Sequence, residues 1–180
     1  MSDEKVYRAL EKLRDPKRLA FLETDQVVRF CLEGISPASV LDVGTGSGLF
    51  AEAFFRLGLV VTGVDIQEAM LEAARTYVPG ASFHLASSEN LPFGDKTFDL
   101  VFLGLVLHES EHPLSALQES GRVGTLRAGV LEWPYREEGF GPPLEHRIKP
   151  DHLQEMAAIA GFPRIKTIPL KYLNLYLLDR

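Results

Sequence analysis

The stretch Ser39-Val-Leu-Asp-Val43 runs directly into Gly44-Thr-Gly-Ser-Gly48, and this junction decides the fold. The first part is a compact apolar run, which is typical of a buried strand. The glycines let the backbone turn tightly and let a ligand approach bare N–H groups. A helical pattern follows over 49–57, so its positive N-terminal end faces a ligand at the turn. The stretch therefore predicts a strand, a ligand-binding turn and a helix.

Strands and helices alternate along the rest of the chain. This alternation predicts an α/β fold, a doubly wound, mostly parallel sheet with helices on both faces. The last two strands are joined by too short a turn for a crossover helix, so we expect an antiparallel hairpin. Thr24 is expected to cap the helix that follows it. Besides 39–43, strands are predicted over 60–64, 82–86, the first half of the apolar run 98–107, 129–133, 164–170 and 172–178. Further helices are predicted over 7–13, 19–23, 25–32, 67–77, 114–123 and 151–160.

Composition narrows the class of protein. The chain has 19 Lys and Arg against 25 Asp and Glu, a net charge of −6, which argues against a nucleic-acid partner because duplex binding leaves a basic stripe. Cys31 is the only cysteine, which excludes an internal disulfide and a Cys-ligated zinc site. The N-terminus has no apolar signal core, and no segment approaches the ~18 apolar residues of a membrane helix. We therefore expect a cytoplasmic protein without integral membrane association.

An acid follows the second predicted strand. Asp65 ends that strand, and in a doubly wound sheet it would lie beside the glycine turn, where the strand order reverses and ligands bind. A carboxylate there can accept hydrogen bonds from a ribose diol. The glycines at 44, 46 and 48 do not match the G-x-G-x-x-G dinucleotide fingerprint, and Asp42 within the turn favours a cation over a pyrophosphate. The alternative is that Asp42 and Asp65 only cap local turns.

Four segments within about 38–133 (40–48, 61–66, 87–93 and 98–101) resemble, in order, the motifs of the class I S-adenosylmethionine-dependent methyltransferases. The resemblance is closest to the small single-domain group of the ubiquinone and menaquinone C-methyltransferases. It implies a seven-stranded, Rossmann-like methyltransferase fold and S-adenosyl-L-methionine as cofactor, with S-adenosyl-L-homocysteine as product. It implies cofactor contacts from Asp42, Gly44, Thr45, Gly46, Gly48, Asp65, Ile66, Ser87, Ser88 and Glu89.

Two departures from the family pattern stand out. Ser87 replaces the usual acid that receives the adenine amino group, and Gly124-Thr-Leu-Arg-Ala-Gly129 stands where a Leu-Lys-Pro-Gly-Gly turn is usual. Met70 is expected to pack within its helix rather than to contact the cofactor.

His108-Glu-Ser-Glu-His112 matches H-E-x-x-H, a zinc motif that needs both histidines on one helical face. Pro113 disfavours helical geometry at His112, so no metal is expected. The resemblance instead places His108 and Glu109 at the end of the fourth strand, above the transferable methyl group. His108 is therefore the candidate catalytic residue, which would orient an acceptor or take its proton, and a histidine hydrogen-bonded at a strand end is the alternative.

The loop after the fifth strand is expected to form a wall of the acceptor pocket. Trp133 and Tyr135 would flank a planar or apolar group, and Arg136 or Arg147 would bind an anion; a solvated surface loop is the alternative. The candidate acceptor-binding residues are Glu109, Trp133, Tyr135, Arg136, His146 and Arg147.

One domain is expected for 1–180. It would comprise an N-terminal helical cap or lid over 1–37, with Tyr7 and Arg18 as candidates to cover the site, and a cofactor-binding core over 38–133. An acceptor-side loop over 134–149 and the last helix and hairpin over 150–180 would complete it.

The expected function is methyl transfer to a small-molecule acceptor, and a homodimer stays open. Two other functions also stay open. One is a cofactor-binding regulatory partner that has lost catalysis, and the other is an NAD(P)-dependent oxidoreductase, which the glycine spacing disfavours.

Overall fold

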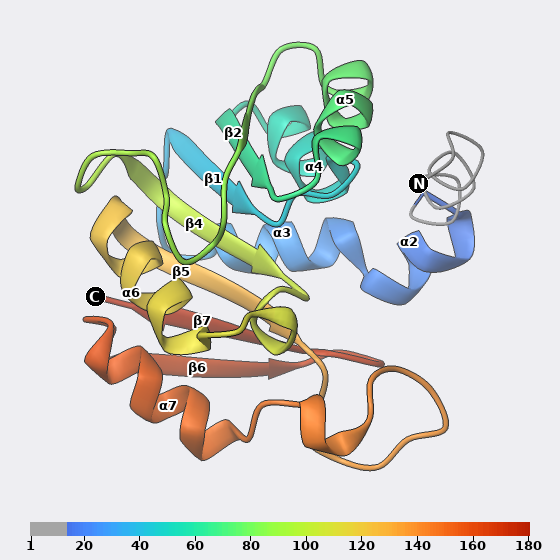
Figure 1. Ribbon diagram of the computed structural model, residues 1–180, viewed down its shortest axis with the longest axis vertical. Coiled ribbons are helices and arrows are strands. Elements are labelled where there is room, and N and C mark those ends of the chain that lie inside the picture. Colours follow the sequence, from blue (N-terminus) through green and yellow to red (C-terminus); the bar gives the residue numbers. More distant parts are fainter. Residues whose placement is uncertain (1–13) are drawn as a thin grey trace.

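The computed structural model describes residues 14–180, and their strands join one sheet (Figure 1). The predicted helix over 7–13 and Tyr7 lie outside the described residues. The strand order is β3-β2-β1-β4-β5-β7-β6, in which β1 to β5 pair in parallel and β7 runs antiparallel between β5 and β6. The predicted doubly wound sheet with a C-terminal antiparallel hairpin is therefore confirmed. The strands are β1 (Ser39–Val43), β2 (Val60–Asp65), β3 (Ser82–Leu85), β4 (Phe98–Gly104), β5 (Gly124–Glu132), β6 (Arg164–Pro169) and β7 (Asn174–Asp179).

Helices cover both faces of the sheet. Successive residues of a strand point to opposite faces, and in β1 Val40 packs into one buried cluster and Leu41 into the other. The Val40 cluster is closed by α3, α4 and α5, and the Leu41 cluster by α6 and α7. The helices are α2 (Pro16–Leu22), α3 (Thr24–Leu32), α4 (Leu49–Arg56), α5 (Glu68–Tyr77), α6 (Pro113–Val123) and α7 (Pro150–Ile159), with short 3-10 turns η1 (Leu107–Glu109) and η2 (Leu144–His146).

Strand β5 begins earlier than the sequence predicts. It starts at Gly124 rather than Gly129, because α6 passes into the strand without an intervening loop. A Cβ atom at Gly124 would lie 2.8 Å from the carbonyl oxygen of Ser120, so this direct junction needs glycine. The segment 124–129, expected to be a turn, is therefore part of the sheet.

The start of α3 also differs from the prediction. Thr24 is the first residue of the helix and not its cap. Glu23 takes the capping position in the left-handed conformation, with φ of 49°, and its side chain makes no capping hydrogen bond. This residue alone separates α2 from α3, so the chain turns sharply between the two helices.

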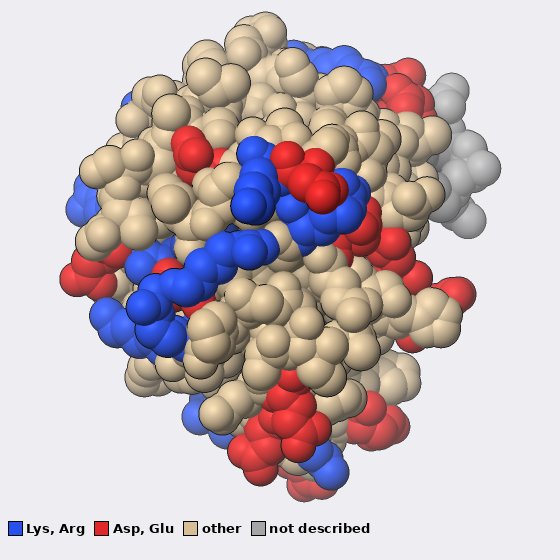
Figure 2. Space-filling view, turned by 90° about the vertical axis from the view of Figure 1, so that its left-hand side faces the viewer, with Lys and Arg blue, Asp and Glu red and all other residues tan. Residues whose placement is uncertain are grey.

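Figure 2 faces the edge of the sheet formed by the amino ends of the parallel strands, opposite the glycine turn. Lys and Arg side chains cross the middle of this face as a band. Arg122, in the last turn of α6, pairs with Glu119 and Asp95 at 2.7 and 3.1 Å and donates to the carbonyl oxygen of Phe93. It thereby ties the β3–β4 connection to α6, so its charge is used within the fold.

Among residues 14–180, no helix is long and apolar enough to cross a membrane.

Candidate active site

The three glycines after β1 have different roles. Gly44, Gly46 and Gly48 all have positive φ, at 65°, 53° and 77°. A Cβ atom at Gly44 would lie 2.4 Å from Val106 Cγ2, and one at Gly48 would lie 3.1 Å from Ala74 Cβ. A Cβ atom at Gly46 would meet nothing within 4 Å. The outer glycines therefore permit close packing, and Gly46 leaves open space that a ligand can enter.

Asp65 is held across this turn by two backbone donors. Gly46 N donates to Oδ2 and Gln67 N donates to Oδ1, each at 2.9 Å. An ionised carboxylate has about four acceptor sites, so Asp65 can still accept bonds from a ligand. Ile66 follows it with 70% of its surface exposed. The carboxylate and the apolar side chain therefore form a pair that suits a ribose and an adenine ring.

Two cavities meet at the carboxyl edge of the sheet. The first, about 380 Å³ and here called the Asp65 cavity, is lined by Ile66, Ser87, Ser88 and Glu89 among others. The second, about 700 Å³ and here called the His108 cavity, is lined by the glycine turn, α2 and Trp133. Both volumes lie in the range of small-molecule sites. The linings of both contain Gly44, Asp65, Gln67, Leu105 and Glu109, so the cavities form one elongated site.

Asp42 supports the turn from behind, contrary to the expectation that it faces the ligand. It is only 2% exposed, and its Oδ2 accepts hydrogen bonds from Thr45 Oγ1 at 2.7 Å and Ala51 N at 3.1 Å. It lines neither cavity. Burial raises the pKa of Asp42 to about 7, although its two hydrogen bonds act in the opposite direction. Asp42 therefore fixes the shape of the turn and the start of α4.

Replacing Asp42 with asparagine should change how stability depends on pH. The folded chain binds the Asp42 proton more tightly than the unfolded chain, so this group lowers the free energy of unfolding as pH rises from about 4 to about 7, by at most about 1.4 kcal/mol per pH unit. Asp42→Asn keeps an oxygen for both donors and removes the buried charge. In urea denaturation at several pH values, the variant should gain stability relative to wild type up to about pH 7. A constant difference across this range would contradict the assignment.

His108 is held by Glu132, the last residue of β5. The imidazole Nδ1 lies 2.8 Å from Glu132 Oε2, and the His108 backbone N donates to Oε1 at 3.2 Å. The two side chains are 8% and 2% exposed. Because a carboxylate only accepts hydrogen bonds, Nδ1 carries the proton and Nε2 keeps a free lone pair. Burial lowers the pKa of His108, but the hydrogen bond and charge of Glu132, with Glu109, outweigh it and raise the pKa overall.

Residues 41–128 match the family model described as a methyltransferase domain. Just under half of this chain thus resembles a methyltransferase domain. This match confirms the predicted resemblance to methyltransferases, and relatives named for menaquinone and ubiquinone methylation confirm its quinone-group part.

Relatives with curated names share this part of the chain. A demethylmenaquinone methyltransferase of Chlorobaculum parvum is 34% identical over 93 residues, which are 51% of this chain and 39% of that protein. A ubiquinone biosynthesis O-methyltransferase of Alkalilimnicola ehrlichii is 35% identical over 107 residues, which are 57% of this chain and 43% of that protein. The match thus spans less than half the length of either relative.

Solved structures match the whole methyltransferase fold. A SAM-dependent methyltransferase from Aquifex aeolicus has a TM-score of 0.80 at 26% identity, covering 96% of this chain and 98% of that one. The magnesium protoporphyrin IX methyltransferase of Synechocystis with bound SAM has a TM-score of 0.76 at 17% identity, covering 99% and 91%. The second likeness concerns the fold alone.

The H-E-x-x-H segment lies on two separate elements. His108 and Glu109 belong to η1, a 3-10 turn beyond the end of β4, and not to the strand end where the sequence placed them. His112 is the capping residue of α6, with φ of −129°. The two histidines therefore do not share a helical face. Within the part of the chain that the structure describes, no cluster of three or more His, Cys, Asp or Glu residues is arranged to hold a metal ion.

Arg147 organises the loop over 134–149, and its geometry does not support the predicted anion-binding role. Its side chain is 1% exposed and lies 3.3 Å from Glu138 Oε2. Arg136, the other candidate, is exposed and pairs with Glu138 at 2.7 Å. The guanidinium of Arg147 donates to the carbonyl oxygens of Pro134, Arg136, Phe140 and Pro142 at 2.8 to 3.0 Å.

The remaining acceptor-side candidates divide between two cavities. Trp133 lines the His108 cavity together with Arg18 of α2. The Trp133 ring lies 5.5 Å from Phe21, which ties α2 to the loop. Tyr135 and His146 instead line a third cavity of about 560 Å³, which also contacts His108.

Several residues of the site carried no clear signal in the sequence. Glu132 is a lone acid at the end of an apolar run, and this pattern is the one clue to its role. Leu105 lines both ligand cavities with φ of 62°, which is strained for a residue with a side chain. Met70, expected to pack within α5, lines the His108 cavity, as does Gln67.

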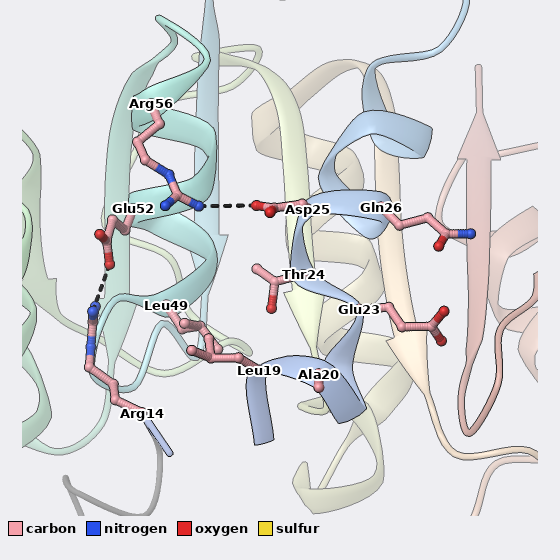
Figure 3. A pocket seen from close by; sticks show the side chains of 10 residues that line it. All are labelled: Arg14, Leu19, Ala20, Glu23, Thr24, Asp25, Gln26, Leu49, Glu52 and Arg56. Atoms are coloured by element: carbon pink, nitrogen blue, oxygen red, sulfur yellow. Dashed lines mark hydrogen bonds and ion pairs between the residues drawn. The ribbon is translucent and has the colours of Figure 1, made fainter. Parts of the chain in front are cut away.

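A cavity of about 600 Å³ lies apart from this site, between α4 and the corner of α2 and α3 (Figure 3). Two ion pairs flank it, Arg14–Glu52 at 2.6 Å and Arg56–Asp25 at 3.0 Å. Thr24 lies next to Asp25 on the α3 side of this cavity and is 7% exposed. Its buried hydroxyl has no hydrogen-bond partner among residues 14–180. A buried polar group without a partner lowers stability.

Thr24→Val should therefore raise the free energy of unfolding, by about 1 kcal/mol, because valine has a similar shape and no hydroxyl. Thr45→Val is the matched control, since the Thr45 hydroxyl donates to Asp42 at 2.7 Å. The control should lose stability in the same urea denaturation experiment. Equal losses in the two variants would show that the Thr24 hydroxyl is paired.

Proposed function

We propose that the protein transfers a methyl group from S-adenosyl-L-methionine to a small-molecule acceptor that loses a proton as it reacts. The observation that carries this proposal is the His108–Glu132 pair on the cavity that the glycine turn and Asp65 also line. A cofactor motif and a candidate base thus face the same space.

The residues at the glycine turn fit the cofactor. When bound, S-adenosyl-L-methionine supplies an electrophilic methyl group on a positively charged sulfur. The open space at Gly46 would take its methionine portion, Asp65 would accept from the ribose hydroxyls and Ile66 would pack on adenine. The hydroxyls of Ser87 and Ser88 line the same cavity and would serve the adenine edge in place of the usual acid.

His108 would accept the acceptor's proton at Nε2. The acceptor would supply the electron pair for the new bond to the methyl carbon, and the sulfur would keep the pair of the bond it loses. A neutral hydroxyl acceptor would then have to lose its proton for the product to be neutral. Glu132 would stabilise the imidazolium that results, as the residue that orients the base does in other enzymes. The cavity contributes by alignment, which can supply roughly 7–11 kcal/mol.

Calorimetry with S-adenosyl-L-methionine, S-adenosyl-L-homocysteine, NAD and NADP tests the cofactor. The proposal expects binding of the first two, and binding of NAD or NADP alone would favour the oxidoreductase. A homocysteine-release screen then tests turnover, beginning with phenols and hydroquinones because relatives are named for menaquinone and ubiquinone methylation. Cofactor binding without turnover on any acceptor would favour the regulatory alternative. A cytoplasmic location and a homodimer stay predictions.

A further inference from the structure

The third cavity is lined by His108 but by no residue of the glycine turn. We call it the Lys149 cavity, and its volume is about 560 Å³. In the described part of the chain, His108 is the one residue that lines both the Lys149 cavity and the His108 cavity. Neither the glycine turn nor Asp65 lines the Lys149 cavity. The space therefore adjoins the candidate base without overlapping the proposed cofactor positions. It is lined by Leu107, His108, Ser110, Pro113, Tyr135, Glu145, His146, Arg147, Ile148, Lys149 and His152.

Basic side chains dominate the polar part of this lining. Lys149, His146 and His152 come from η2 and the start of α7, and Glu145 is the acid among the lining residues. Arg147 adds positive charge from behind, but its donors are already used within the loop. Lys149 and Tyr135 are both exposed, and the Lys149 ammonium lies 5.7 Å from the Tyr135 ring centre.

Two helices also begin at this cavity. Pro113 opens α6 and lines the cavity, and Lys149 and His152 belong to the first turn of α7. In the described chain, neither helix receives a side-chain capping hydrogen bond. Helix N-termini carry partial positive charge and unpaired N–H groups, which adds to the attraction that the side chains exert on an anion.

We propose that the Lys149 cavity binds a carboxylate of the acceptor, so the substrate is a small carboxylic acid whose nucleophilic atom lies at His108. This inference rests on the proposed function and names its substrate class. The carboxylate would pair with Lys149 and the imidazoles of His146 and His152, while the rest of the molecule reaches past Tyr135 to the base. An acceptor that lacks the carboxylate would lose these contacts but would still reach His108.

Paired phenols test the inference by turnover. The probes are 3,4-dihydroxybenzoate and catechol, which differ only in the carboxylate. Lys149→Ala should raise KM for the acid by roughly 10- to 150-fold, as expected for a lost charged partner, and leave kcat and the catechol parameters unchanged. Lys166→Ala is the matched control, because Lys166 is exposed on β6 and pairs with Glu33. An unchanged KM for the acid in Lys149→Ala would overturn the inference and leave the methyltransferase proposal standing.

A binding experiment decides the inference if neither phenol is methylated. Benzoate is titrated into the full chain, and the imidazole carbon-bound protons of His146 and His152 are followed by NMR. The inference expects saturable shifts in wild type and Lys166→Ala and a much weaker response in Lys149→Ala. No saturable shift in wild type, or the same shift in Lys149→Ala, would overturn it. Failed turnover with saturable benzoate binding would count against the proposed function on these acceptors and support the anion site.

Discussion

Replacement of His108 with alanine is expected to lower kcat for methyl transfer by roughly 100- to 10,000-fold, the usual contribution of a positioned base. The acceptor would keep its place but lose the group that takes its proton. The affinity for S-adenosyl-L-methionine should stay nearly unchanged, because the proposed cofactor contacts are the glycine turn and Asp65 and do not include His108. Steady-state kinetics on an acceptor from the screen, with calorimetry for the cofactor, measure the two effects separately.

Glu132→Gln distinguishes a catalytic base from a purely structural histidine. Only if His108 acts as the base should the pH profile of kcat/KM depend on the charge of Glu132. His108 must be neutral to act as a base, so kcat/KM should rise as pH increases through the pKa of His108, which lies above its ordinary value of 6.5. Removing the Glu132 charge should shift this rise to lower pH, and glutamine can still accept the Nδ1 hydrogen bond. A pH profile that is the same in wild type and Glu132→Gln, with full turnover in His108→Ala, would remove His108 from the mechanism.

The sheet could be predicted from the sequence because its signals are local. Strands β1, β2 and β4 are short apolar runs, and helices α4 and α5 follow β1 and β2 closely. The short connection before β7 forces an antiparallel pair. The error at β5 has the same origin. The sequence predicts the strand only from Gly129, yet it begins at Gly124, where glycine is needed because the Ser120 carbonyl oxygen of α6 lies 2.8 Å from where a Cβ would be. The requirement depends on a contact that sequence patterns do not contain.

Site roles were harder to predict because they depend on where side chains end. Arg147 looks like a free cation in the sequence, but the loop folds back so that four carbonyl oxygens meet its guanidinium. Asp42 looks like a ligand contact, but the Thr45 hydroxyl and the Ala51 amide draw its carboxylate beneath the turn. Glu132 is far from His108 in the sequence, and only the parallel pairing of β4 and β5 brings them together.

Gly46→Ala is expected to weaken S-adenosyl-L-methionine binding by roughly 5- to 150-fold, the effect of about 1–3 kcal/mol of overpacking in a filled site. The new methyl group would enter the space that Gly46 leaves open and that the cofactor would occupy. Gly34→Ala is the matched control, since Gly34 also has positive φ, 76°, and an equally open Cβ position, but lines neither ligand cavity. Each variant should lose about 1–2 kcal/mol of stability, because alanine is strained in left-handed backbone. The two variants should therefore differ only in cofactor affinity, which calorimetry measures. Equal cofactor affinity in the two variants would place the cofactor away from Gly46 and overturn the site.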